Sequence, residues 1–408
     1  MKYIVLVGDG MADKPLKTLG FKTCLQKAHT PNMDRLAAEG ETGKVRTIPQ
    51  GFEPGSDVAN LSILGYNPSK YYSGRAPFEA AFRGIKLNSN DVAFRCNLVT
   101  LKFSDSENPG SAVMQDYSAG HITTKEATQI IRDINKKLGD NRIAFYPGMS
   151  YRHLMVWKNG KEKIQCTPPH DITGKKIGSY LPKGKGEEVL RSLMDKSREI
   201  LLSNPVNRNR KKKGLNQANS LWFWGQGKKL TIPEFQDKYH LKGALISAVD
   251  LTKGLGICAG YDILNVKGAT GYIDTNYIGK AKAALRALKN YDIVYLHVEA
   301  PDEAGHNGDM EAKIQAIEDF DAKVVGTILE GIKKFEDYRI LLLPDHFTPI
   351  RVMTHTDEPV PFVIYSSDKS SKKPKAKTPS FSEYICRMKN ILVFEKGYKL
   401  MDYFIKGV

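Results

Sequence analysis

Residues 341–362, LLLPDHFTPIRVMTHTDEPVPF, combine a strand pattern with three side chains that can bind a metal ion. An apolar run typical of a buried strand ends at Asp345 and His346, and His355 follows nine residues later. Carboxylate oxygen and imidazole nitrogen are ligands that suit Zn, Mn, Fe or Mg, and the end of a strand holds them rigidly. An Asp-His pair also occurs as a helix cap or an internal hydrogen bond. The stretch therefore predicts a metal site only if other segments supply further ligands.

Two other apolar runs are also followed by side chains that can bind a metal ion. Residues 3–7 (YIVLV) run into Asp9, which by itself is equally typical of a turn. Residues 293–298 (IVYLHV) lead into Asp302 and His306. Because these two residues are four apart, one helical turn would place both on the same face.

A serine precedes the next helical pattern. Residues 51–66, GFEPGSDVANLSILGY, place Ser56 after Pro-Gly and before apolar residues at helical spacing. A serine at this position is first of all expected to cap the helix. The free N–H groups of a helix N-terminus also attract anions, so a serine that attacks phosphate would suit the same place if metal ligands lay nearby.

The order of the elements predicts the fold class. Helical patterns at 274–288 and 312–329 alternate with strand patterns at 293–298 and 339–343, and a further strand is expected at 361–365. Strand, helix, strand alternation favours an α/β fold with a mainly parallel sheet flanked by helices, whose ligands gather at the carboxyl edge.

The middle of the chain has a different character and is expected to form a second α/β domain. We predict a core domain from residues 1–88 and 262–408, with 89–261 inserted between them. Helices are expected at 123–138, which begins with the capping box Thr123 and Glu126, and at 187–202. Guanidinium groups bind carboxylate and phosphate, although any single arginine or histidine in this part of the chain is more often a surface or core residue than a ligand-binding one. The candidates for holding an anionic substrate are Arg75, Arg95, Arg152, His153 and Arg210.

Seven potential ligands fall near the ends of the predicted strands, which is too many for one tetrahedral ion and suits two. They are Asp9, Ser56, Asp302, His306, Asp345, His346 and His355. Paired divalent ions are a recurring device for phosphoryl transfer. The sequence contains neither a GxxxxGK[ST] loop nor a GxGxxG motif after a strand, so other phosphate-binding machinery is not indicated.

Composition excludes several classes of protein. The 408 residues are 41% hydrophobic and 26% charged, as in a soluble globular chain, and no apolar run is long enough to span a membrane. Five scattered cysteines without CxxC spacing argue against a disulfide framework and for a cytoplasmic location. The net charge of +16 raises the alternative of nucleic-acid binding, but the lysine-rich runs at 208–213 and 369–377 lack the interleaved aromatics that stack bases. We expect a solvated basic surface and no nucleic-acid partner.

Several ordered motifs are similar to one known family. TPNMDRLAAEG (30–40), GSDVANLS (55–62), PDEAGH (301–306) and THTDEPVPF (354–362) resemble the alkaline phosphatase superfamily and, within it, the archaeal type of cofactor-independent phosphoglycerate mutases. FRCNLVT (94–100), TPPHDITGK (167–175) and ANSLWFWGQG (218–227) extend the resemblance through the middle of the chain.

The resemblance implies an isomerase of glycolysis and gluconeogenesis that interconverts 3-phosphoglycerate and 2-phosphoglycerate. It implies that Ser56 becomes phosphorylated, that two divalent ions (Mn, Mg, Zn or Co) are bound, and that 2,3-bisphosphoglycerate is not required. The implied ligands are Asp9, Ser56, Asp345 and His346 for one ion, and Asp302, His306 and His355 for the other. The inserted domain would hold the glycerate. The alternative is a metal-dependent phosphatase or phosphonate hydrolase of the same superfamily, which would release free phosphate.

Overall fold

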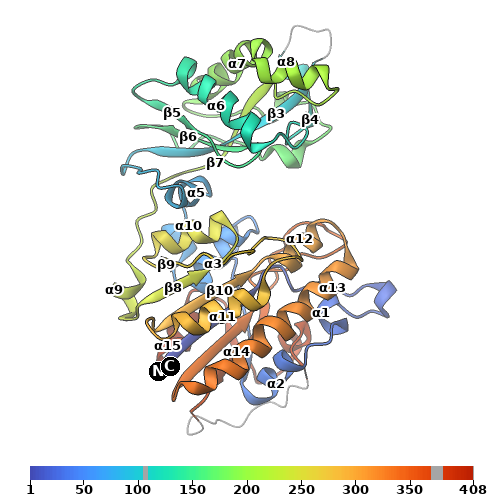
Figure 1. Cartoon of the computed structure of the whole chain (residues 1–408), viewed down its shortest axis with the longest axis vertical. Coiled ribbons are helices and arrows are strands. Elements are labelled where there is room, and N and C mark those ends of the chain that lie inside the picture. The colour runs from blue at the N-terminus through green and yellow to red at the C-terminus, as the bar shows by residue number, and fades with distance from the viewer. Residues whose placement is uncertain (104–108, 369–379, 408) are drawn as a thin grey trace. The chain divides into compact units, whose positions relative to one another are not determined.

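The apolar run at residues 3–7 forms a central strand of the larger sheet. The structure is a computed structural model, and it describes residues 1–103, 109–368 and 380–407. The lysine-rich run at 369–377 lies outside these residues. The chain divides into two compact units, one of residues 1–72 and 231–408 and the other of residues 73–230. Figure 1 shows both units with many of their helices and strands labelled.

Unit 1 is built on an eight-stranded sheet in the order β13-β2-β12-β11-β1-β10-β8-β9. The five strands from β11 to β9 are parallel, whereas β12 runs antiparallel to both of its neighbours. The strands are β1 (Lys2–Gly8), β2 (Glu41–Val45), β8 (Gly243–Ile246), β9 (Asp262–Ile263), β10 (Ile293–Val298), β11 (Tyr338–Leu343), β12 (Val360–Ser366) and β13 (Leu392–Phe394). The expected α/β class with a mainly parallel sheet is confirmed.

Helices cover both faces of this sheet because side chains of a strand alternate in direction. Ile4 and Leu6 of β1 belong to a core with four helical segments, α2 (Pro31–Glu39), α11 (Tyr277–Ala287), α13 (Met310–Asp319) and α14 (Gly326–Gly331), which Figure 1 shows over one face. The neighbouring Tyr3 packs edge-on against Phe404 of α15 (Lys399–Lys406). Tyr295 of β10 likewise contacts α3 (Ser56–Ile63) through Asn60. The second face is therefore covered by α3 and α15.

Unit 2 contains an antiparallel five-stranded sheet, in which the long strand β3 pairs with β4, β6 and β7. The strands are β3 (Val92–Lys102), β4 (Val113–Asp116), β5 (Ile143–Tyr146), β6 (Arg152–Trp157) and β7 (Ser220–Lys228). Its helices are α5 (Ala76–Phe82), α6 (Thr124–Leu138), α7 (Glu187–Ser203) and α8 (Pro205–Lys212). A separate apolar core lies between the sheet and helices α6 and α7.

The observed division differs from the boundaries expected at 88/89 and 261/262. Strand β8 pairs with β10, and helix α10 (Asp250–Cys258) packs beside β8 and β9, so residues 243–263 belong to the sheet of unit 1. Helix α5 packs its Ala76 and Ala80 against Ala93 and Leu154 of unit 2. Both segments are short, so their sequences carry little information about the sheet they join.

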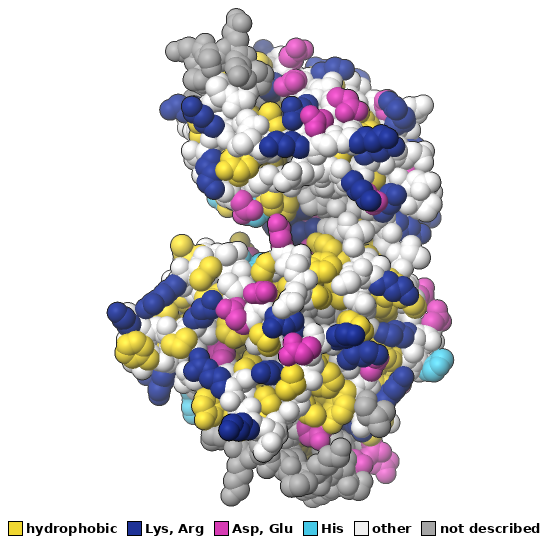
Figure 2. Space-filling view, turned by 180° about the vertical axis from the view of Figure 1, so that it is seen from behind, with side chains coloured by type: hydrophobic (Ala, Val, Ile, Leu, Met, Phe, Trp, Pro, Cys, Tyr) yellow, Lys and Arg dark blue, Asp and Glu magenta, His cyan; other side chains and the backbone are white. Residues whose placement is uncertain are grey.

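Positive charge is dispersed on the face of the molecule in Figure 2. Figure 2 shows lysine and arginine side chains spread over the face it displays and mixed with acidic ones. Among the described residues, no helix is both long and apolar enough to cross a membrane.

Candidate active site

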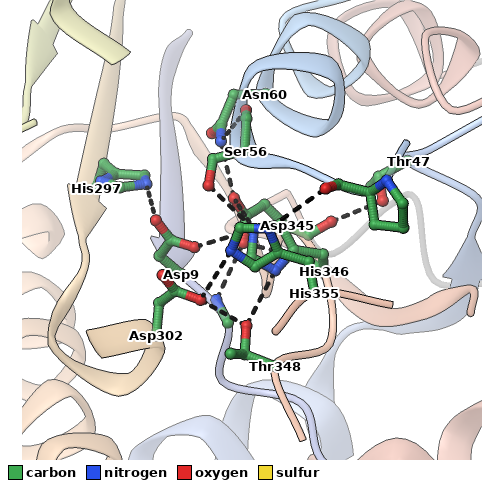
Figure 3. Close-up of polar contacts among 12 residues, drawn as sticks. Asp9, Thr47, Ser56, Asn60, His297, Asp302, Asp345, His346, Thr348 and His355 are labelled. Carbon is green, nitrogen blue, oxygen red and sulfur yellow. Dashed lines mark hydrogen bonds and ion pairs between the residues drawn. The ribbon is translucent and has the colours of Figure 1, made fainter. Parts of the chain in front are cut away.

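Three adjacent parallel strands bring the acidic residues to one edge of the sheet in unit 1. Asp9 follows β1, Asp345 follows β11 on one side of it, and Asp302 lies in α12 (Ala300–His306) after β10 on the other side. The carboxyl ends of parallel strands meet at the same edge, so side chains separated by hundreds of residues converge there. Figure 3 shows these carboxylates around the imidazoles of His346 and His355.

The first group of potential ligands contains Asp9, Asp345 and His346, each with an atom within 4.8 Å of the others. His346 Nε2 lies 3.4 Å from Asp9 Oδ1 and 3.4 Å from Asp345 Oδ2. Ser56 Oγ lies 3.0 Å from the same nitrogen. Three ligands and the serine hydroxyl therefore surround one point.

The second group lies around Asp302. His306 Nε2 is 3.2 Å from Asp302 Oδ2, and His355 Nε2 is 3.5 Å from Asp302 Oδ1. The two imidazole nitrogens are 2.9 Å apart. The ligand atoms of Asp302, His346 and His355 also lie within 4.8 Å of one another, so His346 is within reach of both groups.

The electrostatics of the site suit cations. Asp9, Asp302 and Asp345 are at most 4% exposed, and Asp9 Oδ1 has no hydrogen-bond donor among the described residues. Burial and then the charges of Asp345, Asp302 and Glu299 raise the pKa of Asp9 well above its usual value. Burial would likewise raise the pKa of Asp302, but hydrogen bonds with His306 and His355 lower it well below the usual range. A buried group of carboxylates with an unpartnered oxygen fits divalent cations.

The histidines differ in charge. Burial lowers the pKa of His346 to about 4, so its imidazole is neutral and offers a lone pair. Burial also acts to lower the pKa of His306, but its bond to Asp302 outweighs this effect and raises the pKa to about 9. A neutral imidazole between carboxylates is the form that binds a metal ion.

Ser56 does not cap its helix. It is the first residue of α3, Gly55 occupies the cap position, and the serine side chain faces His346. The expected capping role is therefore not what the structure displays. The hydroxyl lies at the helix N-terminus, where backbone N–H groups favour an anion.

Three polar side chains around the site were not among the sequence candidates. His297 Nε2 lies 3.0 Å from Asp9 Oδ2, without the alignment of a hydrogen bond. Thr348 Oγ1 donates to Asp302 and lies 3.2 Å from His346 Nδ1, and Asn60 contacts Asp345. A histidine inside an apolar strand was a usable signal for His297, whereas nothing in the sequence sets Thr348 apart.

Unit 2 contains a cluster of arginines around one buried carboxylate. Arg95 Nε lies 3.0 Å from Glu79 Oε1, and the guanidinium groups of Arg75 and Arg83 each approach Glu79 to 3.9 Å. The Arg95 guanidinium also lies over the ring of Trp224, 4.2 Å from its centroid. Burial lowers the pKa of Arg95 only to about 10, so it stays charged. One carboxylate faces several guanidinium groups, which leaves this cluster positively charged.

In β6, Arg152 lies opposite Asn97 and His153 opposite Cys96 of β3, so Arg152 shares a face of the sheet with Arg95 and His153 lies on the other face. His153 Nδ1 accepts a hydrogen bond from the Gly148 N–H, and its Nε2 has no partner in the part of the chain described. Burial, and then the charge of Arg83, lowers the pKa of His153 to about 3, so the ring is neutral. Its unpartnered nitrogen is consequently a buried donor, and Arg83 is close enough for its charge to act on the ring. Arg83 was not among the sequence candidates.

Arg210 is held elsewhere in unit 2. Its guanidinium donates to Glu126 (2.9 Å), to the Ala119 carbonyl (2.7 Å) and to the Asn216 carbonyl (2.8 Å), and the side chain is 2% exposed. These bonds join α8 to the start of α6. In the structure Arg210 thus connects two helices, and it does not belong to the arginine cluster around Glu79.

Comparisons with known proteins agree over almost the whole chain. A family model described as 2,3-bisphosphoglycerate-independent phosphoglycerate mutase matches residues 37–207. A probable 2,3-bisphosphoglycerate-independent phosphoglycerate mutase of Geobacter sulfurreducens is 54% identical over 402 residues, which are 98% of this chain and 99% of the relative. The corresponding mutase of Methanosarcina mazei is 53% identical over 371 residues, covering 90% of this chain and 91% of the relative.

Solved structures share the fold over the whole chain. A protein of Pyrococcus horikoshii aligns with a TM-score of 0.81 and 30% identity over 100% of this chain and 97% of its own. A cofactor-independent phosphoglycerate mutase of Thermoplasma acidophilum aligns with a TM-score of 0.65 and 27% identity, over 100% and 99% of the two chains.

Proposed function

The chain belongs to the 2,3-bisphosphoglycerate-independent phosphoglycerate mutases, and we propose that it transfers the phosphoryl group through Ser56 at the site on the carboxyl edge of unit 1. The protein is an isomerase that interconverts 3-phosphoglycerate and 2-phosphoglycerate, as the sequence motifs implied. Its relatives do not favour the alternative of a phosphatase or phosphonate hydrolase.

The observation that carries the proposal is the position of the Ser56 hydroxyl. It lies 3.0 Å from a neutral imidazole that is itself 3.4 Å from two carboxylates. Asp9, Ser56, Asp345 and His346 would hold one divalent ion, and Asp302, His306 and His355 the other. The sites would take Mn, Mg, Zn or Co, since the donors are oxygen and nitrogen and include no thiolate. Such ions, when bound, lower the pKa of the serine hydroxyl and neutralise charge on the phosphoryl oxygens.

The reaction then consists of two transfers. Ser56 Oγ bonds to phosphorus as the ester bond to the glycerate oxygen breaks, and the proton of the serine ends on the released hydroxyl. The second hydroxyl of the same glycerate then takes the phosphoryl group, and Ser56 recovers a proton. Water takes no part in either transfer, so the glycerate has to stay bound between them.

Unit 2 supplies the groups proposed to hold the glycerate. Arg75, Arg95 and Arg152 offer guanidinium donors that match a carboxylate, and the Nε2 of His153 offers a further one. We add Arg83 to this group and leave Arg210 out, because the donors of Arg210 are already bonded.

A cytoplasmic location stays a prediction.

The test is a phosphorus NMR time course with 3-phosphoglycerate and Mn²⁺, without bisphosphoglycerate, on the wild type and Ser56→Ala. The wild type should form 2-phosphoglycerate, and Ser56→Ala should lose at least about three orders of magnitude in rate, as expected for a missing nucleophile. Mass spectrometry of quenched reactions should find phosphate on Ser56.

Ser62→Ala is the matched control. Ser62 lies in the same helix and is fully buried, and its hydroxyl has no hydrogen-bond partner in the described chain, so removal of the hydroxyl should leave the rate unchanged. Turnover by Ser56→Ala at the wild-type rate would remove Ser56 from the mechanism. Release of inorganic phosphate in place of 2-phosphoglycerate would make the protein a hydrolase.

A further inference from the structure

A buried amide connects the serine helix to a carboxylate of the site. Asn60 is fully buried in α3, one turn after Ser56. Its Nδ2 donates to the Ser56 carbonyl at 2.8 Å and to Asp345 Oδ2 at 2.8 Å, while its Oδ1 accepts a hydrogen bond from the Tyr295 hydroxyl of β10. Figure 3 shows Asn60 beside Ser56 above Asp345.

These three bonds fix the orientation of the amide. Both protons of Nδ2 are used, and a flip of the amide would place its oxygen against the carbonyl of Ser56 and the carboxylate of Asp345. The bond to Ser56 is a local bond within one helical turn and would occur in many helices. The bond to Asp345 spans 285 residues of sequence and has no such local explanation.

The amide also completes the hydrogen bonding of Asp345. Asp345 Oδ1 accepts from the N–H groups of Gly10 (3.1 Å) and His346 (2.9 Å), and Asn60 is the side chain that donates to Oδ2. Without Asn60, Oδ2 would lose this hydrogen bond and keep only the His346 Nε2 at 3.4 Å among the described contacts, so the carboxylate could rotate away from Ser56 more easily. Groups that orient a metal ligand in this way typically contribute a factor of about 10 to 100 in metal affinity or activity.

We propose that Asn60 is a positioning residue that fixes the Asp345 carboxylate relative to Ser56 and thereby sets both the metal affinity of the site and the rate of phosphoryl transfer. This inference rests on the proposed role of Asp345 as a metal ligand and of Ser56 as the nucleophile. Asn60 itself touches neither the substrate nor the reacting atoms.

The experiment compares Asn60→Leu with Tyr295→Phe and Ser62→Ala. Leucine has the same number and branching of side-chain heavy atoms as asparagine and lacks both donors, whereas Tyr295→Phe disturbs the same buried contact but leaves both donors in place. Mn²⁺ is titrated calorimetrically into metal-stripped protein, kcat and KM are measured at saturating Mn²⁺, and thermal unfolding establishes that each variant is folded.

Asn60→Leu should weaken one class of Mn²⁺ sites by about 10- to 100-fold and lower kcat by a similar factor, with KM for 3-phosphoglycerate within about twofold of the wild type. Tyr295→Phe and Ser62→Ala should change Mn²⁺ affinity by less than about threefold. If Asn60→Leu does not fold, Asn60→Ala removes the same donors without the branched side chain.

Wild-type Mn²⁺ affinity and kcat in a folded Asn60 variant would overturn the proposal. An equal loss in Tyr295→Phe would also overturn it, because the packing around the amide would then explain the effect. Failure of the proposed function would be recognised differently, because Ser56→Ala would then stay active. The Mn²⁺ titration of the Asn60 variants would still test the contact between Asn60 and Asp345.

Discussion

The carboxylate of Asp9, a proposed metal ligand, is held where its surroundings oppose its ionised form. It is 1% exposed, one oxygen has no donor in the described chain, and Asp345 and Asp302 lie close by. Burial and like charges both oppose its ionised form. As a proposed metal ligand, Asp9 would contribute to function at the expense of the stability of the metal-free fold.

Asp9→Asn should therefore stabilise the metal-stripped protein, by an amount on the order of 1 to 2 kcal/mol. It should also reduce the rise in melting temperature that Mn²⁺ produces, because one ligand charge is lost. Thermal and urea unfolding with and without Mn²⁺ measure both effects.

Asp321→Asn is the contrasting variant. Asp321 is equally buried, but it accepts hydrogen bonds from the Met33 N–H (2.7 Å) and from Asn32 Nδ2 (2.9 Å). Its substitution should destabilise the protein, since buried donors lose their acceptor. A metal-stripped Asp9→Asn protein less stable than the wild type would contradict the explanation.

Glu383 is a buried carboxyl outside the site, and it predicts a pH dependence of stability. Its oxygens accept from the Asp13 N–H (2.8 Å) and the Thr23 hydroxyl (2.7 Å), and burial raises its pKa to about 7. Between about pH 4.3 and pH 7 the folded state keeps a proton that the unfolded chain releases. The free energy of unfolding should therefore fall as pH rises through this window, by on the order of 2 to 3 kcal/mol from this group.

Glu383→Gln should remove this contribution, because a glutamine can accept from Asp13 and donate to the Thr23 oxygen at any pH. The measurement is urea unfolding of metal-stripped protein at pH 5 and pH 7.5. Glu395→Gln, at a side chain that is 66% exposed, should keep the wild-type difference. The same pH difference in Glu383→Gln as in the wild type would show that Glu383 does not carry it.

At the scale of elements, short local signals placed the helices correctly where a cap was present. Helix α6 begins after Thr123, whose hydroxyl accepts from the Glu126 N–H, while Glu126 accepts from the Thr123 N–H. The expected capping box is confirmed. The pattern at 312–329 became α13, a π-helical segment at Phe320–Val325, and α14. The expected helix is therefore present, and its π-helical segment is an addition that hydrophobic periodicity does not report.

Thr123→Ala should lower the stability of unit 2 by about 1 kcal/mol, because it leaves N–H groups of the first turn without an acceptor. Lys125→Ala, two positions later on the exposed side of the same turn, is the matched control and should be within about 0.5 kcal/mol of the wild type. Equal stability of Thr123→Ala and Lys125→Ala in urea unfolding would mean that the cap contributes nothing.

At the scale of the whole molecule, each unit has its own apolar core, and all proposed metal ligands lie in unit 1. A ligand stabilises only the unit that binds it. Removal of Mn²⁺ with a chelator should therefore lower the melting temperature of one calorimetric transition and leave the second in place. Thr123→Ala should lower the melting temperature of the second transition and leave that of the first unchanged. A chelator that shifts both transitions equally would contradict independent unfolding of the units.

The sequence by itself determined the local elements and the chemical nature of the site. The bounds of β10 agree with the pattern at 293–298. Apolar runs followed by Asp9, Asp302 and Asp345 indicated the edge of the sheet, because the periodicity that marks a buried strand depends only on neighbouring residues. The tertiary structure alone decided that Asn60 meets Asp345, that Arg210 is bonded away from Arg95, and that β8 joins the sheet of unit 1. These features depend on contacts between residues far apart in the chain, whose pairing is set by how whole elements pack and not by any local pattern.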